Sequence, residues 1–195
     1  MYDKVKVTYL LNSGFILEIG DCAIIFDYYQ DEKNIVDKII QDKKEVYFFV
    51  SHVHYDHFNP KISEFKDKVT KYFISYDVVT DVLPKEKTII LDEYMTYDDK
   101  NIHVRSFAKN GFVKQMMRLS GLKMDIAFFP VDSRLEEFLD LGVTEFCKVT
   151  EVKNLITMHN VGEKDWIIPE DFPNKEKMNS IWCPKVPGES HFITK

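Results

Sequence analysis

Residues 51–60 of this chain read SHVHYDHFNP, and residues 52–57 within them form the pattern His-x-His-x-Asp-His. Three of the chain's six histidines lie in this window, beside a carboxylate. Imidazole and carboxylate groups are ligands that divalent zinc, iron and manganese accept. The window therefore predicts a site for a divalent metal ion.

The preceding residues predict where this window lies in the fold. Residues 46–50 read VYFFV, an apolar run of β-branched and aromatic residues that is typical of a buried strand. The histidines then follow the carboxyl end of that strand, and ligands usually bind at this edge of an α/β sheet. The alternative is a surface loop that happens to be rich in histidine. Four candidate ligands in six residues, directly after a buried strand, argue against it.

The spacing inside the window separates the ligands into two pairs. His52 and His54 are two residues apart, so an extended backbone points both side chains to the same side. Asp56 and His57 follow after a bend and can face a second, adjacent position. This arrangement suits a pair of metal ions, or one ion with supporting residues around it.

The bulk composition describes a globular chain. With 195 residues and 45% hydrophobic residues, we expect one domain over residues 1–195, with the tail 161–195 packed on the body. Both charge signs are interspersed at a net charge of -6, so nucleic-acid binding is not expected. Three scattered cysteines, no apolar leader and no membrane-length apolar run favour a cytoplasmic protein without membrane attachment.

Strand and helix signals alternate along the chain. We expect strands at residues 5–10, 15–19, 22–26, 46–50, 72–75, 88–91, 102–107, 125–129 and 155–158, and helices at 34–40, 61–68, 112–122 and 143–150. A helical turn is expected at 77–82. A further helix is expected at 134–141, capped by Ser133 and ended by Gly142.

The histidine pattern, in this setting, resembles the metallo-β-lactamase superfamily of metallohydrolases. Residues 13–15, Ser-Gly-Phe, and residues 24–27, Ile-Ile-Phe-Asp, look like the opening strands of that family. Residues 130–134, Pro-Val-Asp-Ser-Arg, and residues 156–159, Ile-Thr-Met-His, look like the later half of the branch related to ascorbate-phosphate lactonases. The similarity runs in order over most of the chain before the tail.

The resemblance implies an α+β fold, a four-layer αββα sandwich that is shortened here, with a metal cleft at one edge. Carried over by position, the metal ligands would be His52 and His54 for a first ion, and Asp56, His57 and His159 for a second. Asp27 would support the histidine loop by holding an imidazole in its metal-binding tautomer. Asp132 and Arg134 are equally well explained as cleft residues or as a helix cap and a surface charge.

This chain departs from the family pattern in its middle. The family supplies a third ligand for the first ion and a bridging Asp from a Gly-Asp pair, but Gly20-Asp21 comes far too early to serve. Between His57 and His159 the only histidine is His103, so a hairpin that carries both ligands is expected to be missing. We therefore expect one ion rather than two, zinc with manganese or iron as alternatives. His103 and Asp132 are candidates to replace a missing ligand.

These residues predict a metal-dependent hydrolase of a small ester, lactone or phosphoester, which uses a metal-activated water with Asp56 as a catalytic proton acceptor. Low activity is expected, because an incomplete metal pair stabilises a leaving oxygen poorly. One alternative is a degenerate, non-catalytic member that binds a metal, a ligand or a partner. Another is a phosphodiesterase or nuclease of the same fold, which the acidic charge disfavours. A homodimer is also expected, since a lost hairpin exposes a sheet edge.

Overall fold

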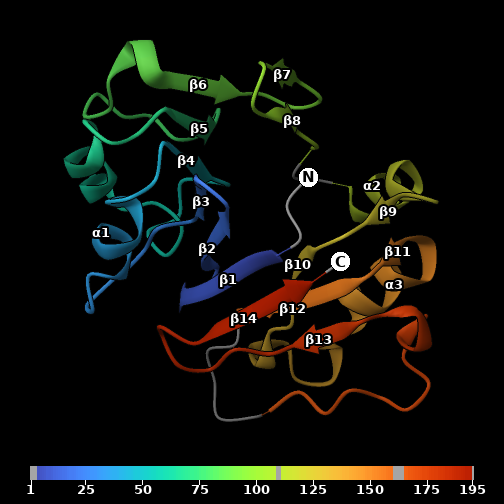
Figure 1. Ribbon diagram of the computed structural model, residues 1–195. Coiled ribbons are helices and arrows are strands. Elements are labelled where there is room, and N and C mark those ends of the chain that lie inside the picture. Colours follow the sequence, from blue (N-terminus) through green and yellow to red (C-terminus); the bar gives the residue numbers. More distant parts are fainter. Residues whose placement is uncertain (1–3, 109–110, 160–164, 195) are drawn as a thin grey trace. The chain divides into compact units, whose positions relative to one another are not determined.

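The computed structural model describes residues 4–108, 111–159 and 165–194 (Figure 1). The chain divides into two compact units. The first unit comprises Met1–Phe107 and Val186–Lys195, and the second comprises Ala108–Lys185. That the whole chain forms a single domain stays a prediction, and the two units are described separately below.

The first unit is built on a seven-stranded sheet in the order β14-β1-β2-β3-β4-β5-β6. Its strands are β1 (Lys4–Leu11), β2 (Gly14–Ile19), β3 (Cys22–Phe26), β4 (Glu45–Val50), β5 (Lys71–Ser75), β6 (Thr88–Leu91) and β14 (Ser190–Thr194). The strands from β14 to β3 pair antiparallel, whereas β3 to β6 pair in parallel. The carboxyl ends of β3, β4, β5 and β6 therefore meet at one edge of the sheet, where the histidine window begins.

One face of this sheet is covered by two short helices, α1 (Ile35–Ile40) and the 3-10 helix η1 (Pro60–Phe65). Val36 and Ile40 of α1 are buried in the same cluster as Phe48 of β4. The ring of Phe65 stacks on that of Phe48, with 5.6 Å between the ring centroids. This packing removes large apolar surfaces from water and holds β4, which carries the histidine window, against the helices.

The side chains that point the other way from β3, β4 and β5 include a row of stacked aromatic rings. Phe49 stacks on Phe26 and on Phe73, at centroid distances of 5.2 and 4.7 Å. Tyr97 meets Phe73 edge to face at 5.0 Å from the short hairpin of β7 (Thr96–Asp98) and β8 (His103–Arg105). The strand that precedes the histidines is therefore packed on both sides, as its apolar sequence predicts.

The second unit contains a three-stranded parallel sheet in the order β10-β12-β13 and a two-stranded parallel pair, β11-β9. Its elements are α2 (Phe112–Leu119), β9 (Lys123–Met124), β10 (Ala127–Pro130), η3 (Ser133–Phe138), α3 (Leu141–Val149), β11 (Glu151–Val152), β12 (Asn154–Met158), η4 (Lys175–Lys177) and β13 (Ser180–Trp182). The described residues between β8 and α2 form no strand, so no hairpin is seen there among them.

Part of the tail packs within this second unit. Phe172 is buried in its apolar core, and the ring of Trp166 lies 5.4 Å from that of Phe172. The indole N–H of Trp166 donates to a carboxylate oxygen of Asp140 at 2.9 Å. The last strand, β14, instead pairs antiparallel with β1 in the first unit.

The expected helical turn at residues 77–82 is wrong, because this stretch forms turns and bends. The N–H of Val82 donates to the side-chain oxygen of Thr80 at 3.3 Å. Such local side-chain bonds compete with the backbone pattern of a helix. The η2 turn (Lys85–Lys87) begins only after Pro84.

The expected bounds of the helix at 134–141 are also wrong. The cap is Asp132, whose Oδ1 accepts the N–H of Arg134 at 3.0 Å, and η3 begins at Ser133. Gly142 does not end a helix but lies inside α3. A Cβ at Gly142 would lie 3.2 Å from Cε1 of Phe129, so this glycine allows α3 to approach β10 closely.

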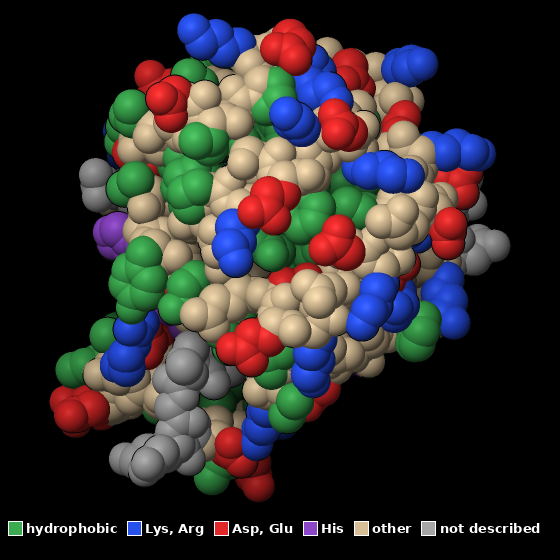
Figure 2. Space-filling model, turned by 90° about the vertical axis from the view of Figure 1, so that its left-hand side faces the viewer, with side chains coloured by type: hydrophobic (Ala, Val, Ile, Leu, Met, Phe, Trp, Pro, Cys, Tyr) green, Lys and Arg blue, Asp and Glu red, His purple; other side chains and the backbone are tan. Residues whose placement is uncertain are grey.

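The surface drawn in Figure 2 carries Lys and Arg side chains interleaved with Asp and Glu, and neither sign forms a continuous patch on that face. The expectation that the chain does not bind nucleic acid stays a prediction. Among the described residues, no helix combines the length and the apolar character that a membrane span requires.

Candidate metal centre

The histidine loop, residues 51–59, is folded back on itself directly after β4. The N–H groups of His57 and Phe58 both donate to the carbonyl oxygen of His54, at 2.9 and 3.0 Å. At the end of the loop, Asn59 donates its side-chain amide to the carbonyl oxygen of Tyr29 at 2.7 Å and caps η1 through the N–H of Lys61. The loop is therefore held by hydrogen bonds at its bend and at its exit.

Asp27, the residue after β3, organises the start of this loop. Its backbone has a φ of 44°, and the parallel pairing of β3 with β4 brings its carboxylate beside Ser51. Oδ1 accepts the N–H of Ser51 and Oδ2 accepts the Ser51 hydroxyl, both at 2.7 Å. The same Oδ2 lies 2.7 Å from Nδ1 of His57. Asp27 and His57 are 6% and 4% exposed, so this is a buried network.

The contact with Asp27 determines what His57 can offer to a metal ion. A carboxylate beside Nδ1 favours the tautomer with the proton on that nitrogen. The lone pair of the imidazole is then on Nε2, which lies 3.8 Å from Oδ2 of Asp56. Two donors on one zinc ion, each at about 2.1 Å, must lie within about 4.2 Å of each other. The pair of Asp56 and His57 meets that condition.

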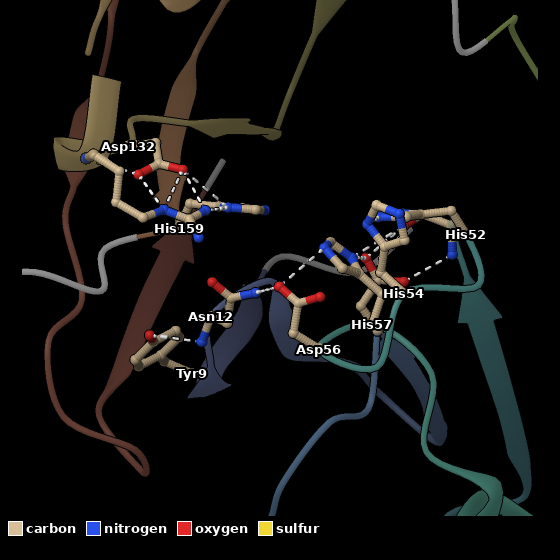
Figure 3. Close-up of polar contacts among 11 residues, drawn as sticks. Tyr9, Asn12, His52, His54, Asp56, His57, Asp132 and His159 are labelled. Carbon is tan, nitrogen blue, oxygen red and sulfur yellow. Dashed lines mark hydrogen bonds and ion pairs between the residues drawn. The ribbon is translucent and has the colours of Figure 1, made fainter. Parts of the chain in front are cut away.

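His52 and His54 form a second pair of donors (Figure 3). Nε2 of His52 lies 3.2 Å from Nδ1 of His54, again within the distance that one ion can span. The Ser51 hydroxyl lies 2.9 Å from Nδ1 of His52 and so helps to set the orientation of that ring. The donor chemistry of this loop, imidazole nitrogen and carboxylate oxygen, fits a divalent metal ion.

His159 lies in the second unit, at the residue after β12, with a φ of 61°. Its Nδ1 is 3.5 Å from Oδ2 of Asp132 and 3.3 Å from Nη2 of Arg134. Nε of Arg134 donates to both oxygens of Asp132, at 2.8 and 3.0 Å. These hydrogen bonds lower the pKa of Asp132 although the carboxyl group is buried. Asp132 and Arg134 thus form an ion pair beside this imidazole.

Four of the predicted ligands come together as two pairs, Asp56 with His57 and His52 with His54, whereas His159 contacts Asp132 and Arg134. Within the described ranges, no group of three or more His, Cys, Asp or Glu side chains is arranged to hold a metal ion. His103, a candidate for a missing ligand, faces Asp98 across the β7–β8 hairpin, with Nδ1 3.3 Å from Oδ2. The metal-binding roles of the loop histidines, Asp56 and His159 stay predictions.

Two residues beside the loop were not predicted from the sequence. The side-chain amide of Asn12 donates to Oδ2 of Asp56 at 2.9 Å, and the backbone N–H of Asn12 donates to the hydroxyl of Tyr9 at 2.9 Å (Figure 3). The only sequence signal is the Asn-Ser-Gly turn between β1 and β2, which by itself indicates a turn and not a contact with the histidine loop.

Comparison with known proteins gives no match to a protein-family model and no match to a curated protein sequence. Solved structures do match. Igni18, described as a novel metallo hydrolase from the archaeon Ignicoccus hospitalis, is 14% identical, covers 98% of this chain and 99% of its own, and has a TM-score of 0.58. A protein from Parabacteroides distasonis that is proposed to be a metal-dependent hydrolase is 15% identical over 92% of each chain, with a TM-score of 0.57.

A third structure shows that the same fold occurs inside a larger enzyme. CmlA, a diiron β-hydroxylase from Streptomyces venezuelae, is 9% identical, with a TM-score of 0.56 over all of this chain and 55% of the hydroxylase. At such identities the likenesses show the fold alone. This chain is an α+β protein with the metallo-β-lactamase fold, as its resemblance to that superfamily implies. The resemblance to the ascorbate-phosphate-lactonase branch stays a prediction.

Proposed function

We propose that this chain is a metal-dependent hydrolase that cleaves a small ester, lactone or phosphoester with a metal-activated water. The observation that carries the proposal is the pair of Asp56 and His57. Its two donor atoms lie 3.8 Å apart, and the buried Asp27 carboxylate holds Nδ1 of His57. A carboxylate behind a metal-binding histidine is a recurrent feature of such sites, because it orients the ring and raises the basicity of the ligand.

In this proposal Asp56 and His57 hold a single divalent ion, and His159 is the expected third ligand. An ion there supplies a nucleophile near neutral pH by lowering the pKa of a bound water. The carboxylate of Asp56 can accept the proton of the attacking water. His52 and His54 offer only two nitrogens, so a second ion would bind more weakly. Zinc is the expected metal, with manganese and iron as alternatives.

The proteins of similar fold are consistent with a hydrolase but do not identify the reaction. Two of them are described as metal-dependent hydrolases, whereas CmlA is a diiron hydroxylase, so the fold alone does not select the reaction. The chemistry must therefore be argued from the donor set of the histidine loop. A cytoplasmic location, a small-molecule substrate and a homodimer also stay predictions.

A second candidate function is metal or ligand binding without catalysis. It is favoured by the arrangement of the donors in pairs, with no group of three within the described parts of the chain. A catalytic zinc site needs three protein ligands and an open position. If a third donor does not join Asp56 and His57, an ion would be held weakly and turnover would be absent.

Metal analysis of protein purified without chelator tests both candidates. We expect about one ion per chain, which is lost in His57→Ala and in His159→Ala because each removes one of three ligands. His103→Ala is the matched control, since His103 is exposed and pairs with Asp98 on a separate hairpin. A panel of lactone, thioester and phosphodiester substrates then identifies the reaction. Bound metal without turnover supports the second candidate. No metal after supplementation with zinc, manganese or iron overturns the first.

A further inference from the structure

The turn between β1 and β2 is built to present one buried amide. Asn12 is 4% exposed and has a φ of 56°, a left-handed conformation that asparagine tolerates better than most residues. Its backbone N–H donates to the hydroxyl of Tyr9, which is 1% exposed. The β1–β2 register shifts between Tyr9 and Leu11, an irregularity of the kind that re-aims side chains next to active sites.

Gly14, two residues further on, brings this turn against Asp27, the residue that supports the histidine loop. A Cβ at Gly14 would lie 2.9 Å from the carbonyl oxygen of Leu11 and 3.2 Å from that of Asp27. Gly14 therefore permits direct backbone contact between the turn and Asp27. Because Asp27 also binds Ser51 and His57, the turn and the loop share one rigid anchor.

From this anchored turn, the amide of Asn12 reaches Asp56, which is 44 residues away in sequence. Nδ2 donates to Oδ2 at 2.9 Å, and Oδ2 is the oxygen that lies 3.8 Å from Nε2 of His57. An ionised carboxylate oxygen can accept two hydrogen bonds or one hydrogen bond and one metal bond. The amide can thus hold Oδ2 in place while leaving it able to bind an ion.

We propose that Asn12 is a positioning residue, which orients the carboxylate of Asp56 for metal binding, and that Tyr9 fixes Asn12 in the required backbone conformation. This inference rests on the proposed metal site. It predicts that the ion is bound less tightly when the amide is removed, although Asn12 is not itself a ligand. The opposite result is expected if the amide competes with the ion for Oδ2.

The test is the affinity of purified, chelator-treated protein for zinc, measured by calorimetric titration. Asn12→Gly removes the amide and accepts the positive φ without strain. We expect its dissociation constant for zinc to rise about 10-fold, at the lower end of the range for residues that support metal ligands. Asn34→Gly is the matched control, because Asn34 also has a positive φ (51°) and its side chain makes no capping hydrogen bond. Its affinity should equal that of the wild type.

Tyr9→Phe is the second variant and alters only a hydroxyl group. It removes the acceptor of the Asn12 N–H, so the zinc affinity should fall, by less than in Asn12→Gly. Tyr72→Phe is its control, since the hydroxyl of Tyr72 is also buried and donates to the carbonyl oxygen of Ile62 at 3.0 Å. Thermal unfolding of each metal-free variant shows that the compared proteins are folded.

The outcomes separate this inference from the proposed function. A wild type that binds zinc together with an Asn12→Gly variant that binds it equally or more tightly overturns the inference and leaves the proposed function standing. A wild type that binds none of zinc, manganese and iron overturns the proposed function. A double-mutant cycle of Asn12→Gly and Asp56→Ala in metal-free protein then tests whether these two side chains interact. If the changes in Tm are additive, the interaction is absent and the inference is overturned. If the two changes are coupled, the interaction is present.

Discussion

Nδ1 of His57 lies 2.7 Å from Oδ2 of Asp27, and both side chains are almost completely buried. The two residues are 30 positions apart in sequence and meet because β3 and β4 are parallel neighbours. Asp27 also accepts two hydrogen bonds from Ser51, so a single carboxylate orients the first residue of the histidine loop and one of its imidazoles.

Replacement of Asp27 should separate metal binding from folding. Asp27→Asn keeps the shape and the left-handed backbone, but its amide N–H facing Nδ1 of His57 favours the tautomer that carries the proton on Nε2. We expect zinc affinity to fall about 10- to 100-fold. Asp27→Ala should also unfold more easily, by about 1–3 kcal/mol, because the buried imidazole of His57 loses its carboxylate partner. Zinc titration and urea unfolding measure the two effects. Unchanged zinc affinity in Asp27→Asn would argue against the supporting role of Asp27.

The turn at Gly14 offers a test of close packing with an adjacent control. Gly14→Ala should destabilise the protein by about 1–3 kcal/mol, because the added methyl group meets two backbone carbonyl oxygens that cannot yield easily. Ser13→Ala should leave the stability unchanged or raise it, since the Ser13 hydroxyl is buried and has no hydrogen-bond partner among the described residues. Urea unfolding of both variants checks the contrast. Equal losses would show that the turn tolerates neither change.

The ion pair of Asp132 and Arg134 predicts a pH dependence of stability. The hydrogen bonds from Arg134 lower the pKa of Asp132, so the stabilisation is present above the unfolded pKa of about 3.9 and is lost as the pH falls through the lowered folded value. Arg134→Met should therefore reduce stability near neutral pH, by less than about 1 kcal/mol because Arg134 is largely exposed. The free energy of unfolding of this variant, measured as a function of pH, should converge with that of the wild type in acid. Parallel curves down to low pH would contradict the assignment.

The thiol of Cys147 should be unreactive in the folded protein. Burial raises its pKa to about 11, and the residue lies in the apolar core beside Phe146. At pH 8 its reaction with a disulfide reagent should be at least about 100-fold slower than in denaturant, where the thiol pKa is about 8.5. The stabilisation from the neutral thiol is present below about pH 8.5 and is lost as the pH rises toward 11. Peptide mass spectrometry after timed labelling identifies the site, and rapid native labelling would show that α3 opens.

Much of the fold could be predicted because its signals are local. The apolar runs that form β1, β4 and β12, and the helical spacing in α1, record in sequence which side chains are turned away from water. In α2 the spacing predicted the helix but not its buried side, since Phe112 is exposed and Gln115 is buried. The predictions failed where the structure of a short segment depended on a residue from another segment that packs against it. Gly142 has the character of a helix terminator, yet its lack of a side chain serves packing against Phe129.

In the candidate site, too, local features could be predicted from the sequence and contacts between distant segments could not. The histidine pattern directly after an apolar strand was enough by itself to place the loop at the edge of the sheet, since that depends on residue type and spacing along one segment. Its resemblance to the metallo-β-lactamase superfamily implied the fold, and the metal chemistry stays a prediction. The resemblance predicts that Asp27 supports an imidazole of the loop, but only the tertiary structure showed that this imidazole belongs to His57 and that Asn12 contacts Asp56. These contacts join segments that are 30 and 44 residues apart through the pairing of strands. A contact of that kind leaves no periodic trace in the sequence, so which donor each group contacts was decided by folding.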